Sequence, residues 1–64
     1  MTEIGTFVYE QDGHRFRVSP EGTDGLRVAV WREADGHKGA HWEPLPELRP
    51  DAPSAVEMAR RFVA

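Results

Sequence analysis

The sequence contains no cysteine, a single lysine and no long hydrophobic run. The lack of cysteine excludes disulfides and thiolate metal sites, and it is typical of proteins from a reducing compartment. No segment approaches the roughly 20 apolar residues that cross a bilayer. The first residues, 1–5, also lack the basic and apolar regions of a secretory signal. The sequence therefore predicts a soluble, cytoplasmic protein with no membrane-spanning segment.

Motifs for catalysis and for cofactor binding are missing as well. Only two serines occur, Ser19 and Ser54, and neither lies in a glycine-flanked nucleophile turn. No glycine-rich phosphate loop ends in Lys-Ser or Lys-Thr. His37 and His41 are four residues apart, but this spacing falls across a glycine-rich turn and not along a helix. We expect no enzyme activity, no catalytic residue, no cofactor and no metal site.

The length of 64 residues predicts one domain that spans residues 1–64. Its composition, with 39% hydrophobic and 30% charged residues, is typical of a globular protein. A domain of this size buries only about 60% of the surface of its unfolded chain, so its core is thin. Without disulfides or a metal, docking onto a partner or forming a homo-oligomer is the remaining way to bury more surface.

A six-residue pattern occurs twice, as Glu10–Arg15 and as Glu33–Lys38. Each copy places an Asp-Gly pair between two strand-like runs, which is the strongest short-range signal for a β-hairpin. Both central residues of a type I′ turn need a positive φ, which aspartate tolerates and glycine adopts freely. The sequence therefore predicts two hairpins with Asp-Gly tips.

In the first hairpin, a two-residue turn fixes which residues lie opposite one another. The expected pairs are Glu10 with Arg15, Tyr9 with Phe16, Val8 with Arg17, and Phe7 with Val18. This register places the aromatic side chains on one face of the hairpin and both arginines on the other. Each opposite-charge or aromatic pair contributes roughly 0.2–1 kcal/mol. The cross-strand pairs and the Asp-Gly turn therefore predict the same hairpin.

The second hairpin has a less certain register, because its two faces are less clearly divided. A two-residue turn would pair Glu33 with Lys38, Trp31 with Ala40, and Ala29 with Trp42. A longer loop through Gly39 is the alternative. It would shift the register by one residue and turn Trp42 to the other face.

Residues 43–53 contain four prolines, which are excluded from the interior of a sheet. We expect an extended, polyproline-like segment that crosses the domain and is held to the core by Leu45 and Leu48. A docking motif for an aromatic groove is the alternative reading of the same segment.

From about Ser54 to the end, the sequence predicts a helix. Ser54 and Glu57 fit a capping box, and Asp51 is a rival N-cap. The apolar stripe, which we expect to be buried up to the last turn, consists of Ala55, Val56, Ala59, Phe62 and Val63, with Met58 beside it. The chain is thus predicted to be α+β, a small antiparallel sheet of about four strands packed by one C-terminal helix.

If the helix covers the Phe/Tyr side of the sheet, the other face carries the candidate binding residues. These are Arg15, Arg17, Arg27, Trp31 and Trp42. Arginine and tryptophan are the residues most enriched at interface hot spots, so we predict a protein-binding surface. Two alternatives stand: the tryptophans bury against the proline-rich segment to enlarge the core, and the arginine bias reflects a GC-rich genome.

In size, acidity and lack of motifs, the chain is similar to small inhibitors encoded by phages and mobile elements, such as anti-CRISPR proteins. This resemblance covers the chain only as a profile, and no functional residue carries over from it. It implies stoichiometric binding to a larger nucleic-acid-handling complex, which blocks assembly or substrate access.

The alternative function is a small nucleic-acid-binding domain. A small sheet followed by a C-terminal helix resembles the arm-binding domains of tyrosine recombinases, which insert a sheet into the major groove. An Arg/Trp face could also stack single-stranded bases. The net charge of −3 and the single lysine depart from both, since phosphate binding needs clustered cations.

Overall fold

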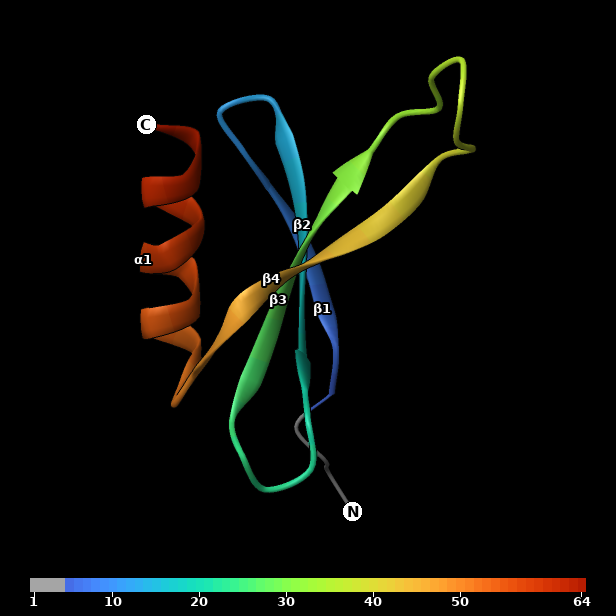
Figure 1. The fold of residues 1–64 in the computed structure, drawn as a ribbon. Helices are drawn as coiled ribbons and strands as arrows, with labels where there is room; N and C mark the ends of the chain where they lie inside the picture. The colour runs from blue at the N-terminus through green and yellow to red at the C-terminus, as the bar shows by residue number, and fades with distance from the viewer. Residues whose placement is uncertain (1–4) are drawn as a thin grey trace.

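The sheet is a four-stranded antiparallel meander in which each strand lies next to the one that precedes it (Figure 1). The computed structural model describes residues 5–64, and residues 1–4, on which part of the expectation about a secretory signal rests, lie outside it. The strands are β1 (Phe7–Gln11), β2 (His14–Pro20), β3 (Leu26–Arg32) and β4 (His41–Arg49), followed by the helix α1 (Ala52–Val63). The predicted α+β fold is confirmed.

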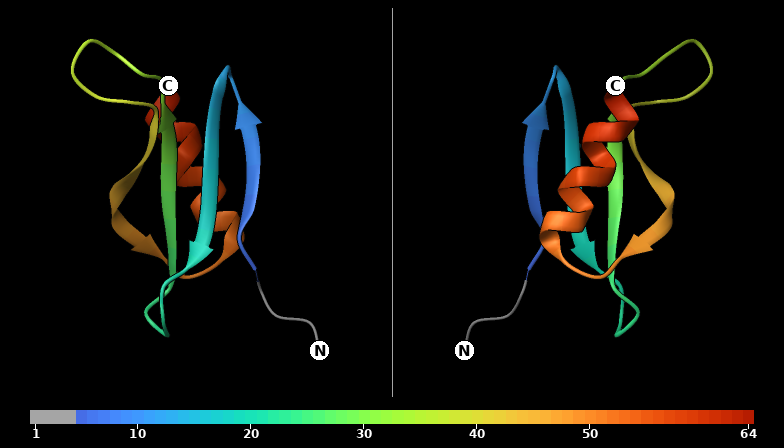
Figure 2. Two further views of the ribbon diagram at one scale, coloured as in Figure 1. Left: turned by 90° about the vertical axis from the view of Figure 1, so that its right-hand side faces the viewer. Right: turned by 90° about the vertical axis from the view of Figure 1, so that its left-hand side faces the viewer.

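The helix covers only one face of the sheet, where it contacts β2, β3 and β4 (Figure 2). Between the two layers lies a small core, which consists of Phe16, Val18, Val28 and Val30 from the sheet and Ala55 and Ala59 from the helix. The two alanines are fully buried, and their small side chains let the helix backbone approach the sheet closely. The predicted thin core is thus confined to one side of the sheet.

The first hairpin forms with the predicted register. Tyr9 lies opposite Phe16 and Glu10 opposite Arg15, and the turn residues Asp12 and Gly13 have φ values of 52° and 82°. Both are in the left-handed region that a type I′ turn requires. The Asp-Gly pair therefore acts here as the sequence predicts.

The second hairpin has a different register from either one that we considered. Trp31 lies opposite Trp42, a shift of two residues from the prediction, and residues 33–40 form a projecting loop (Figure 1). The Asp35 carboxylate accepts hydrogen bonds from the backbone N–H groups of His37 (2.7 Å) and Lys38 (2.8 Å). Asp35 thus folds the chain into a local turn instead of forming a type I′ tip. Because the shift is even, Trp42 stays on the predicted face.

The proline-rich segment is an edge strand and not a crossing segment, which corrects the prediction. Residues 43–49 belong to β4, and Pro44 pairs with Ala29. Between that pair and the pair of Leu48 with Arg27, β4 has two more residues than β3, so the strand bulges. Proline is tolerated on an edge strand and at a bulge, where the missing N–H breaks no ladder. Leu45 packs against the core, as predicted.

The helix begins at Ala52 with Asp51 as its N-cap, so the rival cap is the correct one and the Ser54 capping box is wrong. The Asp51 carboxylate accepts a hydrogen bond from the Ser54 backbone N–H at 2.9 Å. Along the helix, Glu57 and Arg61, four residues apart, form an ion pair at 3.6 Å. Among residues 5–64, no helix is long and apolar enough to cross a membrane.

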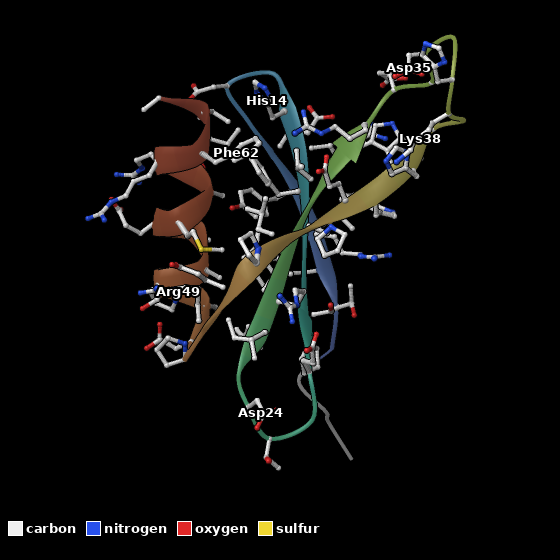
Figure 3. The ribbon with its side chains drawn as sticks, in the orientation of Figure 1. His14, Asp24, Asp35, Lys38, Arg49 and Phe62 are labelled. Carbon is white, nitrogen blue, oxygen red and sulfur yellow. The ribbon has the colours of Figure 1, made fainter. Side chains whose placement is uncertain are left out.

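Phe62 is less buried than predicted, with 38% of its surface exposed. Its ring packs edge-on against Phe16 (6.0 Å between centroids) and His14 (6.4 Å), and the Arg32 guanidinium lies 5.6 Å from its centre. Figure 3 shows Phe62 pointing from the helix toward the hairpin that carries His14. It lies in the last turn of α1, at the rim of the core, so solvent reaches one side of the ring.

The two Asp-Gly pairs should respond differently to substitution. Gly13→Ala forces a side chain into the left-handed region and should cost about 1–2 kcal/mol of unfolding free energy. Gly36→Ala is the matched control, because Gly36 has no positive φ and an added Cβ would meet nothing within 4 Å. It should stay within about 0.5 kcal/mol of the wild type in urea unfolding. Equal costs would contradict the two different turns.

Truncating Phe16 and Phe62 in separate variants tests where the core ends. Phe16→Ala removes a fully buried ring and should cost about 3–5 kcal/mol, enough to unfold so small a domain. Phe62→Ala should cost only about 1–2 kcal/mol, because its ring already contacts solvent. Thermal and urea unfolding give both values. A larger loss for Phe62 than for Phe16 would contradict the placement of the core.

Candidate functional site: the open face of the sheet

The face of the sheet away from α1, here called the open face, is covered by no other element of the described chain (Figure 2, left). Because side chains alternate along a strand, the register assigns each residue to a face. The open face carries Val8 and Glu10 from β1, Arg15, Arg17 and Ser19 from β2, Arg27, Ala29 and Trp31 from β3, and Trp42, Pro44 and Leu48 from β4. All five predicted site residues lie on it.

Two tryptophans form the centre of this face. Trp31 and Trp42 lie directly opposite each other on β3 and β4, and their rings meet at 5.2 Å between centroids with an angle of 68°. This edge-to-face arrangement is the one that aromatic quadrupoles favour. Both side chains are half-buried, so each ring stabilises the sheet with one side and presents the other to solvent. The tryptophans are thus neither fully buried, as the core alternative required, nor fully exposed.

Arg17 adds a cation to this aromatic pair. Its guanidinium carbon lies 4.8 Å from the centre of the Trp42 ring, within the range of a cation–π interaction. Its Nε is buried and finds no hydrogen-bond acceptor among residues 5–64. Within the same part of the chain, no carboxylate lies within ion-pair distance of Arg17. We call Arg17, Trp31 and Trp42 the Arg17–Trp cluster.

Small and apolar residues surround the Arg17–Trp cluster. Arg17 lies between Val8 on β1 and Ala29 on β3, and Ala29 lies opposite Pro44 on β4. Ala29 is only 3% exposed although no helix covers it, so its larger neighbours shield it from solvent. Val8, in contrast, is 52% exposed. The cluster is therefore a cation and two aromatic rings next to the uncharged side chains of Val8, Ala29 and Pro44, and the ion-paired Arg15 and Arg27 lie on the same face.

Arg27 does not join the cluster, although it lies on the same face. Its Nε and Nη2 donate to the two carboxylate oxygens of Glu21 at 2.9 and 2.8 Å, and its Nη1 donates to the Leu45 carbonyl at 2.7 Å. These bonds connect the β2–β3 loop to the bulged part of β4. The hydrogen bonds from Arg27 lower the pKa of the Glu21 carboxyl, and the same contact raises the pKa of Arg27. Arg27 is thus occupied by a structural role.

Arg15 is closer to the cluster but is paired on its own hairpin. Its Nη2 lies 3.2 Å from the Glu10 carboxylate, and about half of its side chain is exposed. A surface pair of this kind contributes little to stability, so a partner can exchange it at small cost. Of the five predicted residues, the structure brings three into contact, leaves Arg15 at the rim and assigns Arg27 to the fold.

Sequence reasoning missed Pro44 and Leu48, which also lie on the open face. Both belong to the segment that the four prolines identified as a crossing connector. Trp42 and Pro44 are two residues apart, which is the spacing of side chains on one face of a strand. A proline, however, usually argues against a strand. Only the edge position of β4 reconciles the two observations.

The acidic loops and the histidines offer no comparable site. Glu21 is bound by Arg27, and the Asp35 carboxylate accepts two hydrogen bonds from its own loop, which lower its pKa. An open cavity of about 570 Å³ between residues 33–38 and the start of β4 is lined mainly by polar side chains, Asp35 and His41 among them. Within residues 5–64, no three His, Asp or Glu side chains are arranged to hold a metal ion.

Two ion pairs, Arg27 with Glu21 and Arg32 with Glu43, can be tested against each other. Arg27→Lys removes the fork that binds Glu21, so the pKa of Glu21 should rise toward its ordinary value while that of Glu43 stays low. Arg32→Lys should do the reverse, because the 2.6 Å hydrogen bond from Arg32 lowers the pKa of Glu43. The side-chain carboxyl shifts in an NMR pH titration measure both values.

The sign of the stability effect follows from these lowered pKa values. Each arginine–glutamate pair stabilises the fold at pH values above the ordinary pKa of glutamate. This contribution is lost as the pH falls through the lowered pKa of the paired glutamate. The loss on acidification should therefore be smaller in Arg27→Lys and Arg32→Lys than in the wild type. A Glu21 pKa that does not respond to Arg27→Lys would contradict the bidentate contact.

No protein-family model matches the sequence, and no curated protein or solved structure matches the chain.

Proposed function

We propose that the protein is a non-enzymatic protein-binding module that uses the Arg17–Trp cluster as its contact surface. The observation that carries the proposal is an arginine held over a half-exposed tryptophan, with no carboxylate of residues 5–64 within ion-pair distance of it. Arginine and tryptophan dominate interface hot spots because they bring large area and directed hydrogen bonds together. Here both kinds of residue are fixed on a rigid sheet, so little side-chain entropy is lost on binding.

The cluster favours a partner with an acidic side chain next to an apolar one. A carboxylate that reaches Arg17 would gain a charge-assisted hydrogen bond, and the two tryptophan rings would bury the neighbouring apolar group. The surrounding Val8, Ala29 and Pro44 carry no charge that would repel an acidic group. The proposed partner chemistry thus follows from the Arg17 guanidinium and the apolar side chains next to it.

Charge argues against the alternative, a nucleic-acid-binding domain. Phosphate binding needs several free cations, since affinity grows with the number of phosphates that are neutralised. Glu10 and Glu21 pair with Arg15 and Arg27, whereas no carboxylate in the described part of the chain lies within ion-pair distance of Arg17. The net charge of −3 opposes approach to a polyanion. Base stacking on the tryptophans remains the specific feature that a nucleic acid would use.

The module can act as a stoichiometric inhibitor, and the profile shared with anti-CRISPR-type inhibitors suggests a target. In this proposal, the protein occupies one acidic and apolar patch on a cytoplasmic, nucleic-acid-handling complex and blocks assembly or substrate access. An inhibitor of this kind needs one binding face and no active site. The open face meets that requirement.

The test compares two variants of the Arg17–Trp cluster with one arginine variant outside it. Arg17→Ala and Trp31→Ala should weaken binding to a purified partner, first captured from host lysate, by about 2 kcal/mol or more. Arg60→Ala is the matched control, because Arg60 is an exposed arginine on α1 with one carboxylate nearby. It should bind like the wild type. Isothermal titration calorimetry gives affinity and stoichiometry, and thermal unfolding checks that each variant folds.

Two results would contradict the proposal. One is full-strength binding by Arg17→Ala and Trp31→Ala, which would place the contact elsewhere. The other is binding that requires nucleic acid and falls steeply with salt concentration, which would support the alternative function. Unfolding of Trp31→Ala would show that this ring is needed mainly for folding. Arg17→Ala alone would then test the open face.

A further inference from the structure

The outer edge of β1 is a free strand edge. Among residues 5–64, β1 pairs only with β2, so one row of its backbone groups has no partner strand. The other edge of the sheet, β4, is protected by Pro44, Pro46 and the bulge, three features that natural proteins use to block edge pairing. β1 has none of these: its five residues include no proline, and its register is regular.

The register tells which backbone groups of β1 point outward. In a hairpin with a two-residue turn, the residues next to the turn exchange both hydrogen bonds, and this pattern alternates along the strands. Phe7, Tyr9 and Gln11 therefore bond to β2, whereas Val8 and Glu10 direct their N–H and C=O groups away from it. The same alternation agrees with the next hairpin, where the N–H of Glu21 bonds to the Gly25 carbonyl at 2.9 Å.

Exposed apolar side chains accompany this free edge. Of the three most exposed large apolar residues among residues 5–64, two belong to β1: Val8, 52% exposed, and Phe7, 38% exposed. They lie on opposite faces of the strand, Val8 on the open face and Phe7 on the face that α1 covers elsewhere. The helix makes its main contacts with β2, β3 and β4 and leaves Phe7 at the margin. Unpaired backbone and exposed apolar side chains thus coincide at one strand.

We propose that β1 pairs with β1 of a second copy of this chain, antiparallel and with the two-fold axis at Val8. In this register Val8 faces the partner's Val8, Phe7 faces the partner's Tyr9, and Thr6 faces the partner's Glu10. Each Val8 and each Thr6–Glu10 pair then exchanges hydrogen bonds through outward-pointing groups. The aromatic pairs fall at the non-hydrogen-bonded positions, where opposite side chains are closest.

The competing registers are less favourable. An axis at Tyr9 would set Val8 against the partner's Glu10, an apolar side chain against a carboxylate. An axis at Glu10 would bring the two Glu10 carboxylates face to face, which costs energy because like charges repel directly across a strand pair. Of these three axes, the one at Val8 matches apolar with apolar residues and keeps the two acidic side chains apart.

The dimer would have a defined geometry and a modest affinity. An antiparallel pair about an axis normal to the sheet gives eight continuous strands, with both helices on one side and both Arg17–Trp clusters on the other. One strand pair buries less than the roughly 1,600 Å² of a standard interface, so we expect exchange between monomer and dimer. The inference does not rest on the proposed function, because it uses the strand edge and not the cluster.

Sedimentation velocity with the full chain tests the proposal. The mass of the wild type should rise from 7.2 kDa toward twice that value between concentrations of about 10 µM and 1 mM. Val8→Lys places two cations at the axis and should weaken dimerisation at least about tenfold, since edge lysines block strand pairing. Val8→Ile is the matched control and should dimerise like the wild type.

Hydrogen exchange provides a second readout that does not depend on a variant. The amides of Val8 and Glu10 should gain protection as the wild-type concentration rises, whereas the Phe7 and Tyr9 amides are already bonded to β2 and should change little. A mass that stays at 7.2 kDa up to about 1 mM, or a Val8→Lys variant that folds and dimerises equally, would overturn the proposal. Self-association without new protection at Val8 and Glu10 would also overturn it.

Discussion

A four-stranded sheet has two faces, and residues 5–64 provide only one helix to cover them. The core of Phe16, Val18, Val28 and Val30 can therefore form on one side only, under the small side chains of Ala55 and Ala59 on α1. The open face has to shield its backbone with its own side chains. It does so with two tryptophans and an arginine, which stabilise the sheet and also present a cation and aromatic edges to solvent.

The relation between β3 and β4 determines whether that cluster exists. Trp31 and Trp42 meet because the loop of residues 33–40 sets them opposite each other. Beyond them the bulge of β4 is held by Arg27, which binds Glu21 and the Leu45 carbonyl together. Arg49 ends β4, and its backbone lies close to Gly25, which has a φ of 136°. A Cβ on Gly25 would lie 2.7 Å from the Arg49 carbonyl oxygen. The open face thus carries both a structural arginine, Arg27, and the arginine of the cluster, Arg17.

Local signals in the sequence predicted the elements whose geometry is determined locally. The Asp12-Gly13 turn gave the first register without error, because both residues adopt the positive φ that the type I′ turn needs. The same dipeptide at Asp35-Gly36 misled, because the Asp35 carboxylate binds its own loop. Pro44 concealed an edge strand, since only tertiary context shows which strand lacks a neighbour. The Arg17–Trp cluster was partly predictable, because an even shift of register keeps Trp42 on the same face.

The Arg17–Trp cluster depends most directly on the pairing of Trp31 with Trp42, and NMR can measure this pairing. The two residues form a non-hydrogen-bonded antiparallel pair, in which the Hα atoms approach each other closely. A strong nuclear Overhauser effect between the Trp31 and Trp42 Hα protons, with contacts between their indole rings, is the predicted result. A strong effect between the Hα protons of Trp31 and Ala40 would instead indicate a two-residue turn at Asp35-Gly36, and the Arg17–Trp cluster would not exist as described.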